Sequence, residues 1–190
     1  MVKRYCFWIA LLFSEVVWAR NLELDLDIGR VQEAGDLSST SSAGPLGGLT
    51  ALMWLNRGEV LSTAMGGYAM ALSLNFSGMH LKQGATEFPF ASDKEFSLFR
   101  SVFMVNPCFL TDHRVQVCAG IGWQMLSLAQ TNYEQTYGSG IWQLEARADL
   151  APTWVAGVRS SYCKIDQEIN GTKSFFELWT NSLFLGYSGW

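Results

Sequence analysis

The chain of 190 residues has little of what most ligand-binding or catalytic domains use. It contains four prolines, two histidines and four cysteines, and its 13 basic residues are outnumbered by 17 acidic ones, giving a formal net charge of −4 at pH 7. The basic residues form no cluster, which excludes the basic face that a nucleic-acid-binding protein requires. Scattered histidines and cysteines predict no metal site, and no residue pattern predicts a catalytic centre or a cofactor.

Long apolar runs are also missing beyond the first twenty residues. Every later apolar stretch is broken by Gly, Asn, Arg or a charged turn before it reaches the roughly twenty residues of a transmembrane helix. At the start, Lys3 and Arg4 precede an apolar segment that ends at Phe13, and Val17-Trp18-Ala19 is a small-x-small ending. This pattern predicts a signal peptide over residues 1–19 and one exported domain over residues 20–190, either soluble or a membrane barrel.

Cysteine usage decides little. Cys6 leaves with the predicted signal peptide, so Cys108, Cys118 and Cys163 remain, an odd number that cannot all pair within one chain. We expect small buried residues with at most one disulfide.

What the chain does contain is a series of extended segments. The sequence predicts eight strands near residues 22–31, 45–55, 59–76, 95–105, 114–128, 139–149, 153–163 and 174–190. The connections after the first, third, fifth and seventh are long or polar, at 32–44, 77–94, 129–138 and 164–173, and the others are shorter. Short turns at one end and long loops at the other are typical of outer-membrane barrels. The last segment is also long enough to cross a bilayer at a tilt.

Several segments alternate between apolar and polar residues with a period of two. In the first segment Leu22, Leu24, Leu26 and Ile28 alternate with Glu23, Asp25 and Asp27. In the sixth segment Trp142, Leu144, Ala146 and Ala148 alternate with Gln143, Glu145, Arg147 and Asp149. In a closed barrel the polar side faces the lumen. The second and third segments are apolar on both sides, and the eighth allows two registers, one with Trp179 and Leu183 outside and one with Glu177 and Asn181 inside.

With these features the chain resembles the small eight-stranded outer-membrane barrels of Gram-negative bacteria, the class that includes the transmembrane domain of outer membrane protein A and the opacity-like proteins. The segment from Thr111 to Trp123 (TDHRVQVCAGIGW) is similar to a turn and fifth strand of that class, and the terminal Trp190 is similar to its assembly signal. The resemblance implies an all-β, eight-stranded, antiparallel up-and-down transmembrane barrel. It also implies location in the outer membrane, periplasmic termini, and the barrel assembly machinery and membrane lipid as partners.

An eight-stranded barrel has an interior just wide enough for side chains to fill. The predicted lumen holds Glu23, Asp25, Asp27, Arg100, Glu145, Arg147, Arg159 and Glu177. Buried charges persist when they are paired and hydrogen-bonded. We therefore expect an ion-pair plug in this lumen rather than a conducting pathway.

The loop charges suggest a surface role. Four lysines lie in or beside the second and fourth long connections and are candidates for contact with lipopolysaccharide phosphates, the alternative being ordinary solvated charge: Lys82, Lys94, Lys164 and Lys173. The predicted function is that of a structural or surface-interaction barrel. The alternative is a lipid A-modifying enzyme, an acyl hydrolase or transferase, for which the resemblance implies a histidine with a polar partner near the outer rim. His80 with Ser77 is the candidate pair on that side. A soluble barrel for an apolar ligand is disfavoured by the inward acids of the first segment, and the oligomeric state stays open.

Overall fold

The computed structural model describes residues 22–35, 43–55, 67–82, 95–110, 115–130, 133–169 and 172–188. The predicted signal peptide and Trp190 lie outside these ranges. Within them, no helix has the length and apolarity needed to span a membrane.

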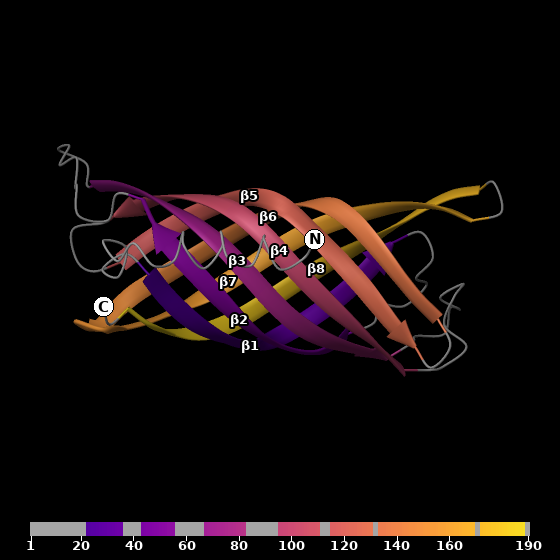
Figure 1. The fold of residues 1–190 in the computed structure, drawn as a ribbon, viewed down its shortest axis with the longest axis horizontal. Helices are drawn as coiled ribbons and strands as arrows, with labels where there is room; N and C mark the ends of the chain where they lie inside the picture. Colours follow the sequence, from indigo (N-terminus) through magenta and orange to yellow (C-terminus); the bar gives the residue numbers. More distant parts are fainter. Residues whose placement is uncertain are drawn as a thin grey trace, which may run out of the picture.

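The described chain forms one closed antiparallel barrel (Figure 1). Each strand pairs with its neighbours in sequence, and the last strand pairs with the first. The strands are β1 (Leu22–Gly35), β2 (Ala43–Trp54), β3 (Gly67–Lys82), β4 (Glu95–Leu110), β5 (Val115–Gln130), β6 (Tyr133–Ala151), β7 (Trp154–Ile169) and β8 (Thr172–Tyr187). The predicted fold class is confirmed: an eight-stranded up-and-down β-barrel.

The barrel has two distinct ends. At the terminal end, β1 begins, β8 finishes, and β2 connects to β3, β4 to β5 and β6 to β7; at the loop end, β1 connects to β2, β3 to β4, β5 to β6 and β7 to β8. The strands tilt around the common axis and wrap it obliquely (Figure 1).

The strands extend further toward the loop end than the sequence predicts. β5 and β6 stay paired as far as Gln130 and Tyr133, and β7 and β8 as far as Ile169 and Thr172. The predicted long connections at 129–138 and 164–173 are therefore wrong, because hairpin pairing continues through their polar residues. Residues 77–82, expected in a loop, belong to β3, while the predicted start of that strand at 59–66 lies outside the described residues.

The alternation of side chains separates an apolar wall from a closed interior. Leu144, Trp142 and Ile121 point outward with 64%, 65% and 54% of their surface exposed, whereas Glu23 and Asp25 of β1 are 0% exposed. In a water-soluble fold this arrangement would leave a large apolar surface unsatisfied, and in a bilayer it is the favourable one.

Two apolar clusters fill the interior on either side of its polar centre. The cluster toward the loop end includes Val31, Met79, Leu126, Ile165 and Leu178. The cluster toward the terminal end comprises Leu52, Trp54, Ala69, Ala71, Cys108 and Cys118. Cys108 and Cys118 face each other across β4 and β5 and form a disulfide, while Cys163 is a free, buried thiol.

Candidate functional site

The candidate site is the polar centre of the lumen, and its acidic half comes from β1. Glu23, Asp25 and Asp27 alternate with outward leucines, so the pleat of the strand turns all three carboxylates inward. Gly186 of β8 lies opposite Asp25, and a Cβ added there would collide with the Asp25 carboxylate oxygen. The missing side chain at residue 186 thus leaves the space that the β1 carboxylates occupy.

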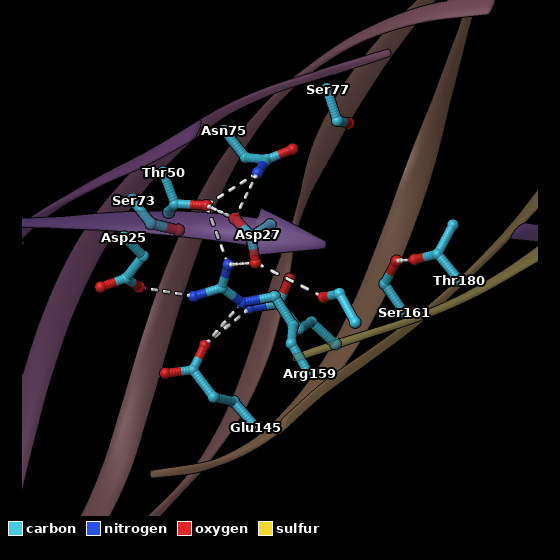
Figure 2. Close-up of polar contacts among 12 residues, drawn as sticks. Asp25, Asp27, Thr50, Ser73, Asn75, Ser77, Glu145, Arg159, Ser161 and Thr180 are labelled. Carbon is cyan, nitrogen blue, oxygen red and sulfur yellow. Dashed lines mark hydrogen bonds and ion pairs between the residues drawn. The ribbon is translucent and has the colours of Figure 1, made fainter. Parts of the chain in front are cut away.

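Arg159 of β7 lies among three carboxylates from two other strands (Figure 2). Its Nη2 is 2.8 Å from Asp25 Oδ2, its Nη1 is 2.5 Å from Asp27 Oδ1, and its Nε is 2.8 Å from Glu145 Oε2. Each of the three guanidinium nitrogens therefore contacts a different carboxylate. Such charge-assisted bonds are among the stronger polar contacts in proteins.

Arg147 of β6 is the second guanidinium of the cluster and lies nearer the terminal end. It pairs with Glu23, and its Nη1 lies 3.1 Å from Glu145 Oε1. Its Cζ lies 5.1 Å from the centroid of the Trp54 ring, while Phe184 lies between the two arginines at 5.5 Å from Arg147 and 4.6 Å from Arg159. Aromatic faces thus cover the guanidinium surfaces that carboxylates leave open.

Neutral side chains of β2 and β3 supply further hydrogen-bond donors to Asp27. Thr50 Oγ1 donates to Asp27 Oδ2 at 2.7 Å and accepts from Arg159 Nη1 at 2.8 Å, and Asn75 Nδ2 donates to Thr50 Oγ1 at 2.7 Å. Figure 2 shows Thr50 and Asn75 above the Asp27 carboxylate. The sequence does not predict these partners, because the segments of β2 and β3 are apolar on both sides over much of their length.

Arg100 is also buried in the lumen but lies apart from the acids. Its Nε donates to Ser77 Oγ at 3.0 Å, and its Nη1 donates to Ser161 Oγ at 3.1 Å and Thr180 Oγ1 at 3.4 Å. The Ser161 and Thr180 hydroxyls also bond to each other. Arg100 is therefore held by hydroxyl groups toward the loop end, next to the apolar cluster there.

Glu177, expected in the lumen, is placed elsewhere. Leu178, Thr180 and Phe184 of β8 are buried, whereas Trp179 and Leu183 are 45% and 60% exposed, so the odd-numbered residues of β8 face outward. The carboxylate of Glu177 accepts a hydrogen bond from the Tyr162 hydroxyl at 3.0 Å on that outer face. The register with Phe184 inside is one of the two that the sequence allows, and Phe184 occupies the space between the two lumen arginines.

The four predicted surface lysines are described unequally. Lys164 is exposed on the outer face of β7, with its Nζ 3.8 Å from the centroid of the Phe175 ring. For Lys82 and Lys173 the structure describes the backbone, which pairs with Glu95 and Glu168. Lys94 lies outside the described residues.

His80 does not face Ser77, because the two residues lie on opposite faces of β3. Ser77 points into the lumen toward Arg100, whereas His80 lies on the outer face opposite Ser97 of β4, with 3.4 Å between His80 Nδ1 and Ser97 Oγ. The described residues contain no group of three acidic, cysteine or histidine side chains that could hold a metal ion.

A closed barrel with an apolar outer wall and a charged interior filled by side chains is a transmembrane β-barrel. No protein-family model matches the chain, and no curated protein matches it in sequence. Among solved structures, neisserial surface protein A is similar with a TM-score of 0.63 and 13% sequence identity, over 88% of this chain and 97% of that one. This similarity, at low identity, shows a shared fold, that of the small outer-membrane barrels, in agreement with the location that the sequence predicts.

Two further solved structures align with the chain over similar lengths. The attachment invasion locus protein Ail of Yersinia pestis matches with a TM-score of 0.48 and 12% identity, over 88% of this chain and 98% of that one. The N-terminal β-barrel domain of Pseudomonas aeruginosa OprF matches with a TM-score of 0.44 and 10% identity, over 86% and 96%.

Proposed function

We propose that this chain is a structural or surface-interaction barrel of the bacterial outer membrane that does not conduct ions. Its termini face the periplasm, and the barrel assembly machinery inserts it. The observation that carries the proposal is the filled lumen, in which Arg147 and Arg159 contact four carboxylates between two apolar clusters. A barrel filled in this way leaves its outer wall and its loop end as the surfaces available for function.

The ion pairs act as a structural plug in this proposal. Glu23, Asp25, Arg147 and Glu145 are each at most 4% exposed, so the charges are held by one another rather than by water. Separating them to open a path would leave buried charges unpaired, which is strongly destabilising. Trp54 and the disulfide-linked Cys108 and Cys118 lie in the apolar cluster on the terminal side.

The loop end supports the second half of the proposal, contact with lipopolysaccharide or with external partners. Lys164 is exposed there, and Lys82 and Lys173 lie in the last residues of β3 and the first of β8. Ammonium groups at this rim are suited to lipid phosphates as point charges.

Binding to lipopolysaccharide vesicles tests this contact. A variant with Lys82, Lys94, Lys164 and Lys173 all changed to Gln should bind about tenfold more weakly in low salt, and the difference should shrink as salt rises. A matched variant with the same four lysines changed to Arg keeps the charge and should bind as the parent does. Equal binding by the Gln and Arg variants would show that these lysines do not contact the lipid.

A second candidate function, hydrolysis of a lipid A acyl ester, is favoured by the contact between His80 and Ser97. A serine hydroxyl beside a histidine has the arrangement of a nucleophile with its base. Mass spectra of lipid A from cells that express the parent or the Ser97→Ala variant test this function. Loss of an acyl chain with the parent alone would establish the hydrolase, and identical spectra from both strains and from a deletion strain would exclude it.

A further inference from the structure

Three polar side chains form a row on the outer wall of the barrel. Arg30 of β1 is paired in register with Asn181 of β8, which is paired with Ser160 of β7. Arg30 and Asn181 are exposed and Ser160 is half-buried. None of the three side chains forms a hydrogen bond or an ion pair with another residue of the part of the chain that the structure describes.

Apolar side chains border this row on both sides. Two positions closer to the terminal end, Ile28, Leu183 and Val158 are 62%, 60% and 52% exposed. Two positions closer to the loop end, Trp179 of β8 and Tyr162 of β7 pack with their ring centroids 4.5 Å apart. Aromatic residues of membrane barrels gather at the interface with the headgroups, so the polar row lies at or just inside that interface. Polar groups without partners are costly at this depth.

The row also forms one wall of a groove. A hollow of about 840 Å³ crosses the outside of the barrel from Val117 of β5 to Pro45 of β2. It lies between two rows of outward side chains. The row toward the loop end is Leu144, Ser160, Asn181 and Arg30, and the row toward the terminal end is Ala146, Val158, Leu183 and Ile28. Small side chains at Ala146 and Ser160 leave the groove open. One wall is therefore apolar along its length, and the other ends in a cation.

We propose that this groove binds one phosphorylated membrane lipid from the leaflet at the loop end. The lipid phosphate accepts hydrogen bonds from the Arg30 guanidinium and the Asn181 amide, and one acyl chain lies along Val158, Leu183 and Ala146. A guanidinium fork matches the oxygens of a phosphate, and the exposed Arg30 has no carboxylate partner among the described residues. The site rests on the proposed membrane location but uses none of the loop-end lysines.

Charge complementarity selects this occupant over a second copy of the chain. A symmetric dimer through the same wall would bring Arg30 near the Arg30 of its partner, and the outward residues of the groove supply no carboxylate to separate them. A lipid phosphate supplies the negative charge and the apolar chain together.

Native mass spectrometry of the folded full chain, released from nanodiscs of phosphatidylcholine, tests the proposal. The probe is phosphatidic acid, compared with diacylglycerol of the same chains and with inorganic phosphate. The parent should retain one phosphatidic acid. Arg30→Gln should weaken that binding about tenfold, as expected for loss of a charge-assisted hydrogen bond, and Ala146→Leu should weaken it by filling the groove.

Two matched variants serve as controls. Gln32→Ala changes the next outward side chain of β1, and Ala51→Leu adds the same bulk to the outer face of β2 away from the groove. Both should bind phosphatidic acid as the parent does. Three results would each overturn the proposal. Diacylglycerol could bind as well as phosphatidic acid, or inorganic phosphate alone could displace phosphatidic acid from the barrel. The third is a dimer of the parent that Arg30→Gln abolishes. Because the lysine variants leave Arg30 intact, their failure to affect lipopolysaccharide binding would not affect this result.

Discussion

Removal of Arg159 is the perturbation that most strongly tests the lumen cluster. Arg159→Ala leaves Asp25, Asp27 and Glu145 without the guanidinium that contacts each of them within 2.8 Å. Removing one partner of a buried ion pair costs about 3 to 5 kcal/mol, and three stranded carboxylates place this variant at the upper limit, about 5 kcal/mol. Equilibrium urea unfolding in detergent micelles, followed by tryptophan fluorescence, measures the loss.

The matched control is Arg30→Ala, the same change on the outer wall. Arg30 has no carboxylate partner among the described residues, so its removal should cost no more than about 1 kcal/mol. If Arg159→Ala and Arg30→Ala lower the free energy of unfolding equally, the three carboxylates do not depend on Arg159 and the cluster has been misinterpreted.

A combined variant separates charge from packing. Arg159→Met together with Asp25→Asn, Asp27→Asn and Glu145→Gln keeps similar side-chain volumes and removes the stranded charges. Replacing a buried charge together with its partners is often tolerated, whereas removing one partner alone is not, so most of the stability lost in Arg159→Ala should return. A combined variant as unstable as Arg159→Ala would assign the loss to packing around Phe184 instead.

Further substitutions test the faces of the barrel and the balance of charge within it. Leu144→Arg places a cation in the lipid and should cost about 2 to 4 kcal/mol, whereas Gln143→Arg, beside the Glu145 carboxylate that Gln143 already contacts at 3.3 Å, should be tolerated. Gly186→Ala should destabilise the barrel by about 1 to 3 kcal/mol because its Cβ collides with Asp25. Asp25→Asn should cost less than Arg159→Ala, since the cluster holds more carboxylates than guanidinium groups. Urea unfolding in micelles measures each change.

Thiol labelling gives an independent check on the two faces. With Cys163→Ala as the background, Leu144→Cys should react with a lipid-dissolved reagent and Gln143→Cys should not. Equal labelling at both positions would mean that the alternation on β6 is reversed or absent.

The amino-acid sequence is sufficient to predict the fold and much of the lumen. In β1 and β6 the charges alternate strictly with large apolar residues, and one periodicity fixes both faces of such a strand. Strand ends are predicted less well. Asn170-Gly171, a dipeptide that favours tight hairpins, lies between the last residue of β7 and the first of β8, but the polar residues on both sides of it indicate a longer loop than the structure has.

The neutral polar side chains of β3 that face the lumen are difficult to predict from the sequence for a different reason. Ser73, Asn75 and Ser77 alternate with Leu72, Leu74 and Phe76, but this short pattern is obscured by the apolar residues before it. The position of Glu177 depends on the register of β8, where apolar residues occur on both faces, and in the observed register Phe184 packs against Arg147 and Arg159. Such packing is a tertiary effect that no local periodicity contains.

Single-channel recording in planar lipid bilayers determines whether the lumen is closed, on which the proposed function depends. Protein that shows the heat-sensitive gel shift of a folded barrel is incorporated and held under an applied voltage. Because Arg159 and Arg147 hold four carboxylates between two apolar clusters, we expect no discrete conductance steps from the folded parent. Reproducible, steady openings of the parent in proportion to the folded protein added would contradict a closed lumen.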